Sequence, residues 1–191
     1  MVSKTNELGW IAVEIPFEAE LAAKKHRKER DKLYGNIYYE EKSDERWVGD
    51  LGEFAFKSWL NSEGYSNYTW LLEDSAGRAD FTMVDDVSID VKTVKRKVEP
   101  RRGYTAQITA QHINEPTMHY FFMSYHYPHR VMWLLGGISK EDFKRDAIYY
   151  GQGDKVHEHY SIRAGHEIYN IDILKLLPPK KWLLQFQQNL D

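Results

Sequence analysis

The chain has 191 residues, with 26 Lys or Arg against 29 Asp or Glu, which gives a formal net charge of −3 at pH 7. This length suits one domain, and a near-neutral chain can contact nucleic acid only through a local basic patch. Cysteine is absent, which excludes disulfides, thiolate zinc sites and a cysteine nucleophile. Since no apolar run has the length of a membrane span and no signal-peptide pattern is present, we expect a cytoplasmic protein without a membrane partner.

Residues 17–34 are predicted to form a helix, because Pro16 precedes them and apolar residues recur at roughly helical spacing. Its later turns carry mostly basic side chains, which suit either a solvated face or contact with phosphates. We expect residues 1–42 to form a helical arm packed on a core domain of residues 43–191.

A second helix is predicted over residues 44–62, capped by Ser43 or Asp44. Gly49 and Gly52 lie next to Glu53 on this helix, although each glycine costs roughly 1 kcal/mol of helix stability relative to alanine. We therefore expect the helix to approach another backbone closely at these glycines and to carry Glu53 into that contact. The predicted apolar face consists of residues at helical spacing: Trp47, Leu51, Phe54, Ala55 and Trp59.

The rest of the chain has mostly strand character, interrupted by turns and two short helices. Ser139 is expected to cap the first of these helices, and Pro178 precedes the second. The pattern predicts one α/β or α+β domain in which helices flank a mixed sheet. Strands are expected at 68–72, 79–84, 87–95, 104–109, 120–125, 131–135, 159–162 and 167–171, turns at 75–77 and 85–86, and helices at 139–147 and 182–190.

The most informative stretch contains three charged residues, Asp80, Asp90 and Lys92. Side chains alternate along a strand, so Asp90 and Lys92 share one face while their apolar neighbours face the core. Asp80 lies on the preceding strand, and it faces Asp90 only when the loop between the strands has an odd number of residues. We therefore predict an odd loop, such as residues 84–86, or a bulge.

Two carboxylates placed in this way, with Cβ atoms ~5 Å apart, form an oxygen site suited to Mg²⁺ or Mn²⁺. Lys92 cannot bind the cation, but it can hold a water molecule or a phosphate oxygen and stabilise developing negative charge. Glu53 would add a further carboxylate. A cation, acids and a lysine are the groups that phosphodiester hydrolysis requires.

Glu53, Asp80 and the segment Asp90-Val91-Lys92 resemble the PD-(D/E)XK nuclease superfamily, with its restriction-endonuclease-like fold. Residues 133–143 are similar to the strand, glycine turn and helix of small phage and bacterial members, and residues 169–178 to their closing segment. The resemblance covers roughly residues 45–180. Ala79 stands where the proline of the motif would be, but that proline is not a ligand.

The resemblance implies a metal-dependent nuclease that cuts DNA. It implies that Asp80 and Asp90 bind the metal with the carbonyl oxygen of Val91, that Glu53 completes the shell, and that Lys92 orients the attacking water. Family members often carry a glutamine that positions the water or a substrate phosphate. Gln111 has the better spacing for this role here, and Gln107 is the alternative.

A basic run follows the motif and is interpreted as the track for the nucleic-acid backbone, with a solvated loop as the alternative. Its residues are Lys95, Arg96, Lys97, Arg101 and Arg102.

Other chemistry-bearing residues are expected to lie outside the site. Asp85 and Asp86 suit a solvated turn, and Glu73 and Asp74 are weaker candidates that could reach the site from a strand end. The histidines lack an i, i+4 pair, so structural or exposed roles are favoured over zinc for His126, His129, His157, His159 and His166.

These patterns predict a magnesium-dependent deoxyribonuclease, an endonuclease that forms a homodimer because cutting both strands calls for two sites. The rival is a non-catalytic nucleic-acid-binding or assembly protein on the same fold with an idle site. The choice of DNA over RNA, the choice of endonuclease over exonuclease, and the sequence specificity stay open, because they depend on loops that fold analogy does not supply.

Overall fold

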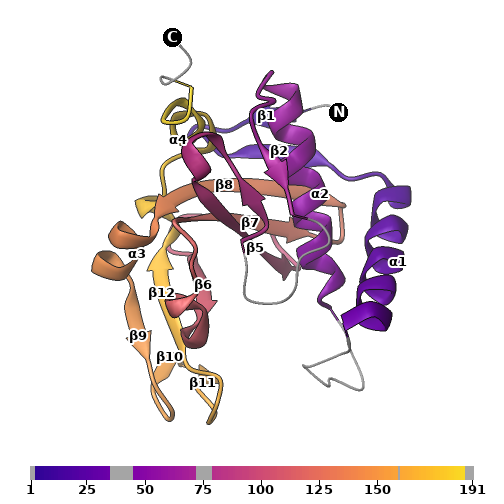
Figure 1. The fold of residues 1–191 in the computed structure, drawn as a ribbon. Helices are drawn as coiled ribbons and strands as arrows, with labels where there is room; N and C mark the ends of the chain where they lie inside the picture. Colours follow the sequence, from indigo (N-terminus) through magenta and orange to yellow (C-terminus); the bar gives the residue numbers. More distant parts are fainter. Residues whose placement is uncertain (1–2, 35–44, 72–78, 159, 188–191) are drawn as a thin grey trace.

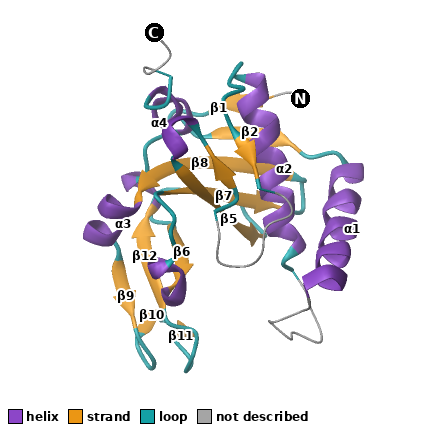
Figure 2. Cartoon of the chain, viewed as in Figure 1, coloured by secondary structure: helices purple, strands orange, loops and turns teal. Residues whose placement is uncertain are grey.

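The computed structural model describes residues 3–34, 45–71, 79–158 and 160–187. Within them, a curled mixed sheet of seven strands runs in the order β1-β2-β8-β7-β5-β4-β3. A smaller sheet, β6-β12-β9, and the hairpin β10-β11 lie beside it (Figure 1). The predicted class, a mixed sheet flanked by helices in one compact domain, is confirmed, and Figure 2 shows the helices lying around the strands.

The elements have the following bounds. The strands of the large sheet are β1 (Ser3–Thr5), β2 (Ile11–Glu14), β3 (Thr69–Trp70), β4 (Phe81–Thr82), β5 (Ser88–Arg96), β7 (His119–His126) and β8 (Val131–Ser139). The other strands are β6 (Thr105–Thr109), β9 (Ile148–Tyr150), β10 (Lys155–His157), β11 (Tyr160–Ser161) and β12 (Ile168–Asp172). The helices are α1 (Phe17–Tyr34), α2 (Trp47–Ser62), α3 (Lys140–Asp146) and α4 (Pro179–Leu184). None of these described helices combines the length and apolar character needed to cross a lipid bilayer.

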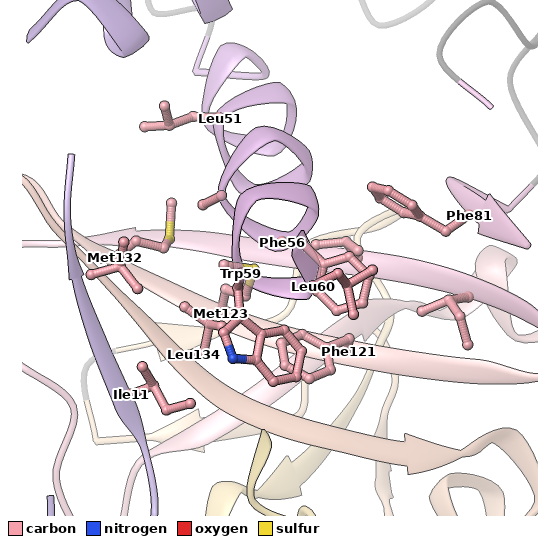
Figure 3. Packing of buried hydrophobic residues seen from close by; sticks show 14 of the residues in the cluster. Ile11, Leu51, Phe56, Trp59, Leu60, Phe81, Phe121, Met123, Met132 and Leu134 are labelled. Atoms are coloured by element: carbon pink, nitrogen blue, oxygen red, sulfur yellow. The ribbon is translucent and has the colours of Figure 1, made fainter. Parts of the chain in front are cut away.

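Strand alternation divides the core into two clusters on opposite faces of the large sheet. Phe121 and Met123 of β7 pack toward α2, where Phe56 and Trp59 cover them (Figure 3). Their neighbours on β7 pack toward β6, β12 and α3 instead. The central strand pair, β5 with β7, is parallel, and the remaining neighbours in the large sheet are antiparallel.

The N-terminal residues differ from the expected helical arm. Helix α1 matches the predicted range of 17–34, but residues 3–14 supply β1 and β2, and β2 pairs with β8, which lies far along the chain. These strands are three and four residues long, and the alternation of Ile11, Val13 and Ile15, all buried, with Ala12 and Glu14 is a signal for β2 that the sequence analysis missed. Because of them, the N-terminal segment is part of the main sheet.

The glycine pair that was expected to form a turn, Gly136 and Gly137, lies inside β8. A Cβ atom on Gly136 would lie 2.0 Å from the carbonyl oxygen of Leu177, and one on Gly137 would lie 2.3 Å from Nε1 of Trp182. These glycines therefore let α4 and the segment before it pack against the strand. The two glycines are therefore needed because neighbouring segments approach β8 closely, and not because the chain reverses there.

Other expectations for secondary structure have mixed outcomes. Ser139 caps α3 by accepting a hydrogen bond from the backbone N–H of Asp142, as predicted. Strands β9 and β10 were not predicted. The prediction that Ser43 or Asp44 caps the second helix is wrong, because α2 begins at Trp47 and its N-cap is Arg46. The turn at 75–77 lies outside the described residues.

Candidate functional site

The hairpin β4–β5 has the odd loop that the sequence analysis predicted. Phe81 pairs with Ile89 and Thr82 with Ser88, and the N–H of Met83 donates to the carbonyl of Val87. The chain reverses through the three-residue 3₁₀ turn Val84–Asp86. Extended by one residue pair, this register places Asp80 opposite Asp90.

Two hydrogen bonds fix Asp80 at the end of β4. Its backbone N–H donates to the carbonyl of Ile89 over 2.9 Å, and its Oδ2 accepts from the N–H of Val91 over 2.7 Å. Burial raises the pKa of the Asp80 carboxyl well above its usual value, and the nearby charges of Glu53 and Asp90 raise it further. The carboxylates of Glu53 and Asp90 therefore lie near enough to Asp80 for their charges to raise its pKa.

Lys92 lies on the same face of β5 as Asp90, two residues further along the strand. Its Nζ is 2.7 Å from Oδ2 of Asp90, and Asp90 is itself buried, with 4% exposure. Burial lowers the pKa of Lys92, but the adjacent Asp90 outweighs that effect and the net pKa is raised. The amine is therefore a permanent cation and hydrogen-bond donor at neutral pH.

Helix α2 carries Glu53 into the protein rather than toward solvent, as expected. Its exposure is 6%, and its Oε2 accepts from the indole N–H of Trp70 over 3.0 Å. A close approach occurs at Gly52, where a Cβ atom would lie 1.8 Å from Oγ1 of Thr93 on β5, although the neighbour is a side chain rather than the backbone that was predicted. It does not occur at Gly49, where a Cβ atom would meet nothing within 4 Å.

A cluster of opposite charges joins α1 to α2 behind Glu53, and the sequence analysis did not foresee it. Asp50 is fully buried and is contacted by Nε of Arg27 at 2.7 Å, Nδ1 of His26 at 3.2 Å and Nη1 of Arg30 at 3.3 Å. Nη1 of Arg30 also lies 3.7 Å from Oε1 of Glu53. Arg27 and Arg30 are therefore held by Asp50, whereas Lys25 and Lys28 of the same helix are exposed, as the interpretation of a solvated face predicted.

His112 is a further site residue that sequence reasoning missed. Lys92 Nζ lies 3.2 Å from its Nδ1, and burial together with the charge of Lys92 lowers the pKa of the imidazole. The neutral ring then accepts a hydrogen bond from the ammonium group. The only sequence signal was its place next to Gln111, because no spacing rule relates it to Lys92.

A cavity of about 390 Å³ opens beside Lys92, between the large sheet and β6. His112 and Gln107 belong to its lining, whereas Gln111 is exposed and outside the lining. Of the two glutamines considered for positioning a substrate, only Gln107 therefore belongs to the cavity lining, although both side chains are exposed.

The basic run is divided by strand alternation. Lys95 lies on the helix side of β5, where its Nζ contacts Oε1 of Glu45 at 2.7 Å. Arg96 lies on the cavity side, where its Nη2 donates to the carbonyl of Thr105 over 3.2 Å. Lys97 is exposed. The residues of the basic run therefore do not form one continuous track for a nucleic-acid backbone.

The end of the basic run lies near an aromatic ring. The guanidinium groups of Arg96 and Arg101 lie 5.0 and 5.4 Å from the ring centroid of Tyr104, and Arg101 and Arg102 are exposed. Arg96 and Tyr104 thus line the cavity here, and Arg101 lies near the same ring without belonging to the lining.

Two of the four remaining acidic candidates lie among the described residues. Asp85 and Asp86 are exposed in the turn, as predicted, and both have φ near 55°, a conformation that aspartate tolerates better than most residues. Glu73 and Asp74 lie outside the described residues.

The histidines are dispersed. His126 is buried, with its ring 4.8 Å from that of His129, while His157 and His166 lie in the distal β10 strand and a loop, and His159 is outside the described residues. Across the described parts of the chain, no group of three or more His, Cys, Asp or Glu side chains is arranged to hold a metal ion.

Comparison with models of known protein families and with curated protein sequences finds no match to this chain. The function of this protein therefore has to be inferred from its residues and their geometry.

Proposed function

We propose that this protein is a metal-dependent deoxyribonuclease, an endonuclease with a PD-(D/E)XK site on a restriction-endonuclease-like fold. The observation that carries the proposal is the meeting of Asp80, Asp90 and Lys92 at one end of hairpin β4–β5, with Glu53 close by and a cavity with basic residues in its lining alongside. An ordinary surface hairpin has no need to bury like charges together, since this costs stability.

The residues fit a divalent cation of the Mg²⁺ or Mn²⁺ type. Mg²⁺ is commonly held by one or two carboxylates together with water and substrate phosphates, so Asp80 and Asp90 suffice as side-chain ligands. Burial is the main cause of the raised pKa of Asp80, and the negative charges of Glu53 and Asp90 add to it although Lys92 opposes them. Asp80 and Asp90 would hold the ion with the carbonyl of Val91, and Glu53 would support the shell. The ion would supply activation of a water molecule and neutralisation of phosphate charge.

The chain's own groups have separate tasks in this proposal. The Val91 N–H fixes the carboxylate of Asp80. Lys92, which is protonated and held between Asp90 and His112, cannot accept a proton, so it acts as an electrostatic stabiliser of the phosphate and as a donor that orients the water.

The test is incubation of the full chain with supercoiled, linear and branched DNA, and with RNA, in Mg²⁺ or in EDTA. We expect DNA cleavage in Mg²⁺ and none in EDTA. Asp90→Ala and Lys92→Ala should each lower the cleavage rate by about 100-fold or more, as removal of preorganised electrostatic groups does in other enzymes.

Asp86→Asn is the matched control, because Asp86 is an acid of the same hairpin that is exposed in the turn. It should cut at the rate of the unmodified chain. Wild-type cleavage by either site variant would contradict the site, and DNA binding without cleavage under any of these conditions would favour the non-catalytic alternative.

A further inference from the structure

The amine of Lys92 has three N–H donors, and two side chains among the described residues contact it. Oδ2 of Asp90 lies 2.7 Å from Nζ, and Nδ1 of His112 lies 3.2 Å from it. Lys92 also lines the cavity, and 23% of its side chain is exposed. The third donor is therefore available to a phosphate oxygen or a water molecule that enters from the cavity.

The two partners of Lys92 differ in charge. Asp90 attracts the ammonium group as a carboxylate, and a divalent cation bound to the same carboxylate would weaken that attraction. His112 is a neutral acceptor at neutral pH, because burial and the charge of Lys92 lower the pKa of its imidazole. Its contact with the amine therefore does not depend on the net charge of the carboxylate site.

The fold holds His112 in place through the short 3₁₀ helix that carries it, Ala110–Asn114. The backbone carbonyl of His112 accepts a hydrogen bond from the hydroxyl of Tyr120 over 3.3 Å. Tyr120 is fully buried and pairs with Asp90 in the register of β7 with β5. Ile113, the next residue, is buried in the same core cluster as Tyr120. These anchors restrict where the imidazole can lie.

The contacts of the ring also select its tautomer. Because Nδ1 accepts a hydrogen bond from the Lys92 ammonium, the proton of the neutral ring lies on Nε2. Nε2 is 3.9 Å from Oε1 of Glu115, a carboxylate that attracts this N–H group. Nζ of Lys140 donates to the backbone carbonyl of Glu115, which ties that residue to the start of α3. The ring thus has a donor beside Nδ1 and an acceptor on the side of Nε2.

We propose that His112 is a positioning residue of the nuclease site, whose imidazole holds the Lys92 amine so that the third N–H points into the cavity at the substrate phosphate. The inference rests on the proposed nuclease function and adds a residue to its site. An amine held by Asp90 alone would turn more freely on its flexible stem. Because His112 acts through Lys92, its removal should slow the cleavage step rather than weaken the binding of DNA.

The first test measures the contact in EDTA and without DNA, so that its outcome does not depend on catalysis. NMR of the histidine rings in the full chain gives the pKa of His112, whose signal is the one that His112→Asn removes. Lys92→Gln should raise this pKa toward the ordinary histidine value, because the charge of Lys92 contributes to its depression. Lys95→Gln is the matched control, since Lys95 lies on the other side of β5 against Glu45, and it should leave the pKa unchanged.

The second test measures cleavage of DNA in Mg²⁺ by two variants of His112. His112→Leu has no acceptor and should lower kcat about tenfold, the effect of losing one hydrogen bond to a charged group, while KM changes less than about twofold. His112→Asn keeps an oxygen that can accept from Lys92 and should retain kcat within about threefold of the unmodified chain. His129→Leu is the matched control, because His129 is exposed in the turn between β7 and β8, and it should cut at the unmodified rate.

The outcomes separate this inference from the proposed function. A protein that never cuts DNA but shows the pKa change in Lys92→Gln confirms the contact and overturns the nuclease. In a protein that cuts DNA, the positioning role is overturned by an unchanged pKa of His112 in Lys92→Gln, by cleavage at the unmodified rate in His112→Leu, or by equally slow cleavage in His112→Asn and His112→Leu. The NMR measurement on Lys92→Gln keeps His112 intact, so it decides the contact even when His112→Leu does not fold.

Discussion

Glu53 shows how burial changes the chemistry of a single residue. In the folded chain, burial raises the pKa of its carboxyl to about 7, although the Trp70 indole N–H opposes this shift and Asp50 adds to it. The unfolded chain has a pKa near the ordinary glutamate value. Between these two pKa values the native state holds a proton that the unfolded state has lost.

The sign of the pH dependence follows from linkage. Because the native state binds the extra proton, Glu53 makes the free energy of unfolding fall as the pH rises from about 4.5 to about 7, and the loss is complete above that range. The shift from 4.5 to about 7 corresponds to at most about 3 kcal/mol.

We therefore predict that Glu53→Gln is less sensitive to pH than the unmodified chain. Urea denaturation in EDTA at pH 5 and pH 8 should show a stability loss for the unmodified chain that exceeds the loss for the variant, by up to about 3 kcal/mol. Titratable groups distant from Glu53 contribute equally to the pH dependence of both proteins, so their effect cancels when the variant is compared with the unmodified chain. Parallel pH profiles would show that Glu53 titrates normally in the folded protein.

At the scale of elements, α2 is the part that connects the core to the site. One face packs Phe56 and Trp59 on the sheet (Figure 3), and another places Gly52 against β5 and Glu53 next to Trp70. The spacing between α2 and β5 therefore also sets the position of Glu53.

Two substitutions in α2 test this spacing. Gly52→Ala places a methyl group against Thr93 and should destabilise the protein by about 1–3 kcal/mol, as overpacking does. Gly49→Ala meets nothing within 4 Å and should stabilise the helix by up to about 1 kcal/mol. Thermal and urea denaturation give both values, and effects of the same sign would mean that the contact with β5 does not restrict the helix.

At the scale of the whole molecule, the net charge of −3 conceals separate regions of opposite sign. Carboxylates gather at the end of hairpin β4–β5, and cationic side chains gather at the cavity and its far end. On α1, three basic residues are already engaged by Asp50 of α2. Binding of nucleic acid should therefore depend on a few local cations.

The salt dependence of nucleic-acid binding measures how many cationic side chains contact phosphates. If Lys92, Arg96 and Arg101 contact phosphates, the logarithm of the affinity for a single-stranded oligonucleotide should fall with the logarithm of salt concentration with a slope of about −2, at ~0.7 per contact. Arg96→Gln should reduce this slope by about 0.7. Fluorescence anisotropy in EDTA between low and moderate NaCl gives the slope, and a value several times steeper would place the interface on a broader basic surface.

The spacing of residues in the sequence predicted the geometry of the candidate site better than it predicted which segments form strands. The register of Asp80 with Asp90 required only the alternation of strands and an odd loop, and the structure has both. The short strands β1 and β2 and the glycine pair of β8 were not predicted, because their conformations depend on partners far away in the sequence, such as β8 for β2 and Trp182 for Gly137.

The sequence by itself determined which residues share a face: Asp90 with Lys92 on β5, and Gly52 next to Glu53 on α2. These relations follow from the periods of strand and helix, which are local properties of the backbone. Only the tertiary structure decided that His112 contacts Lys92, that Asp50 engages α1, and that Arg96 rather than Lys95 reaches the cavity. Those contacts join segments that no short-range period relates, so packing alone selects them.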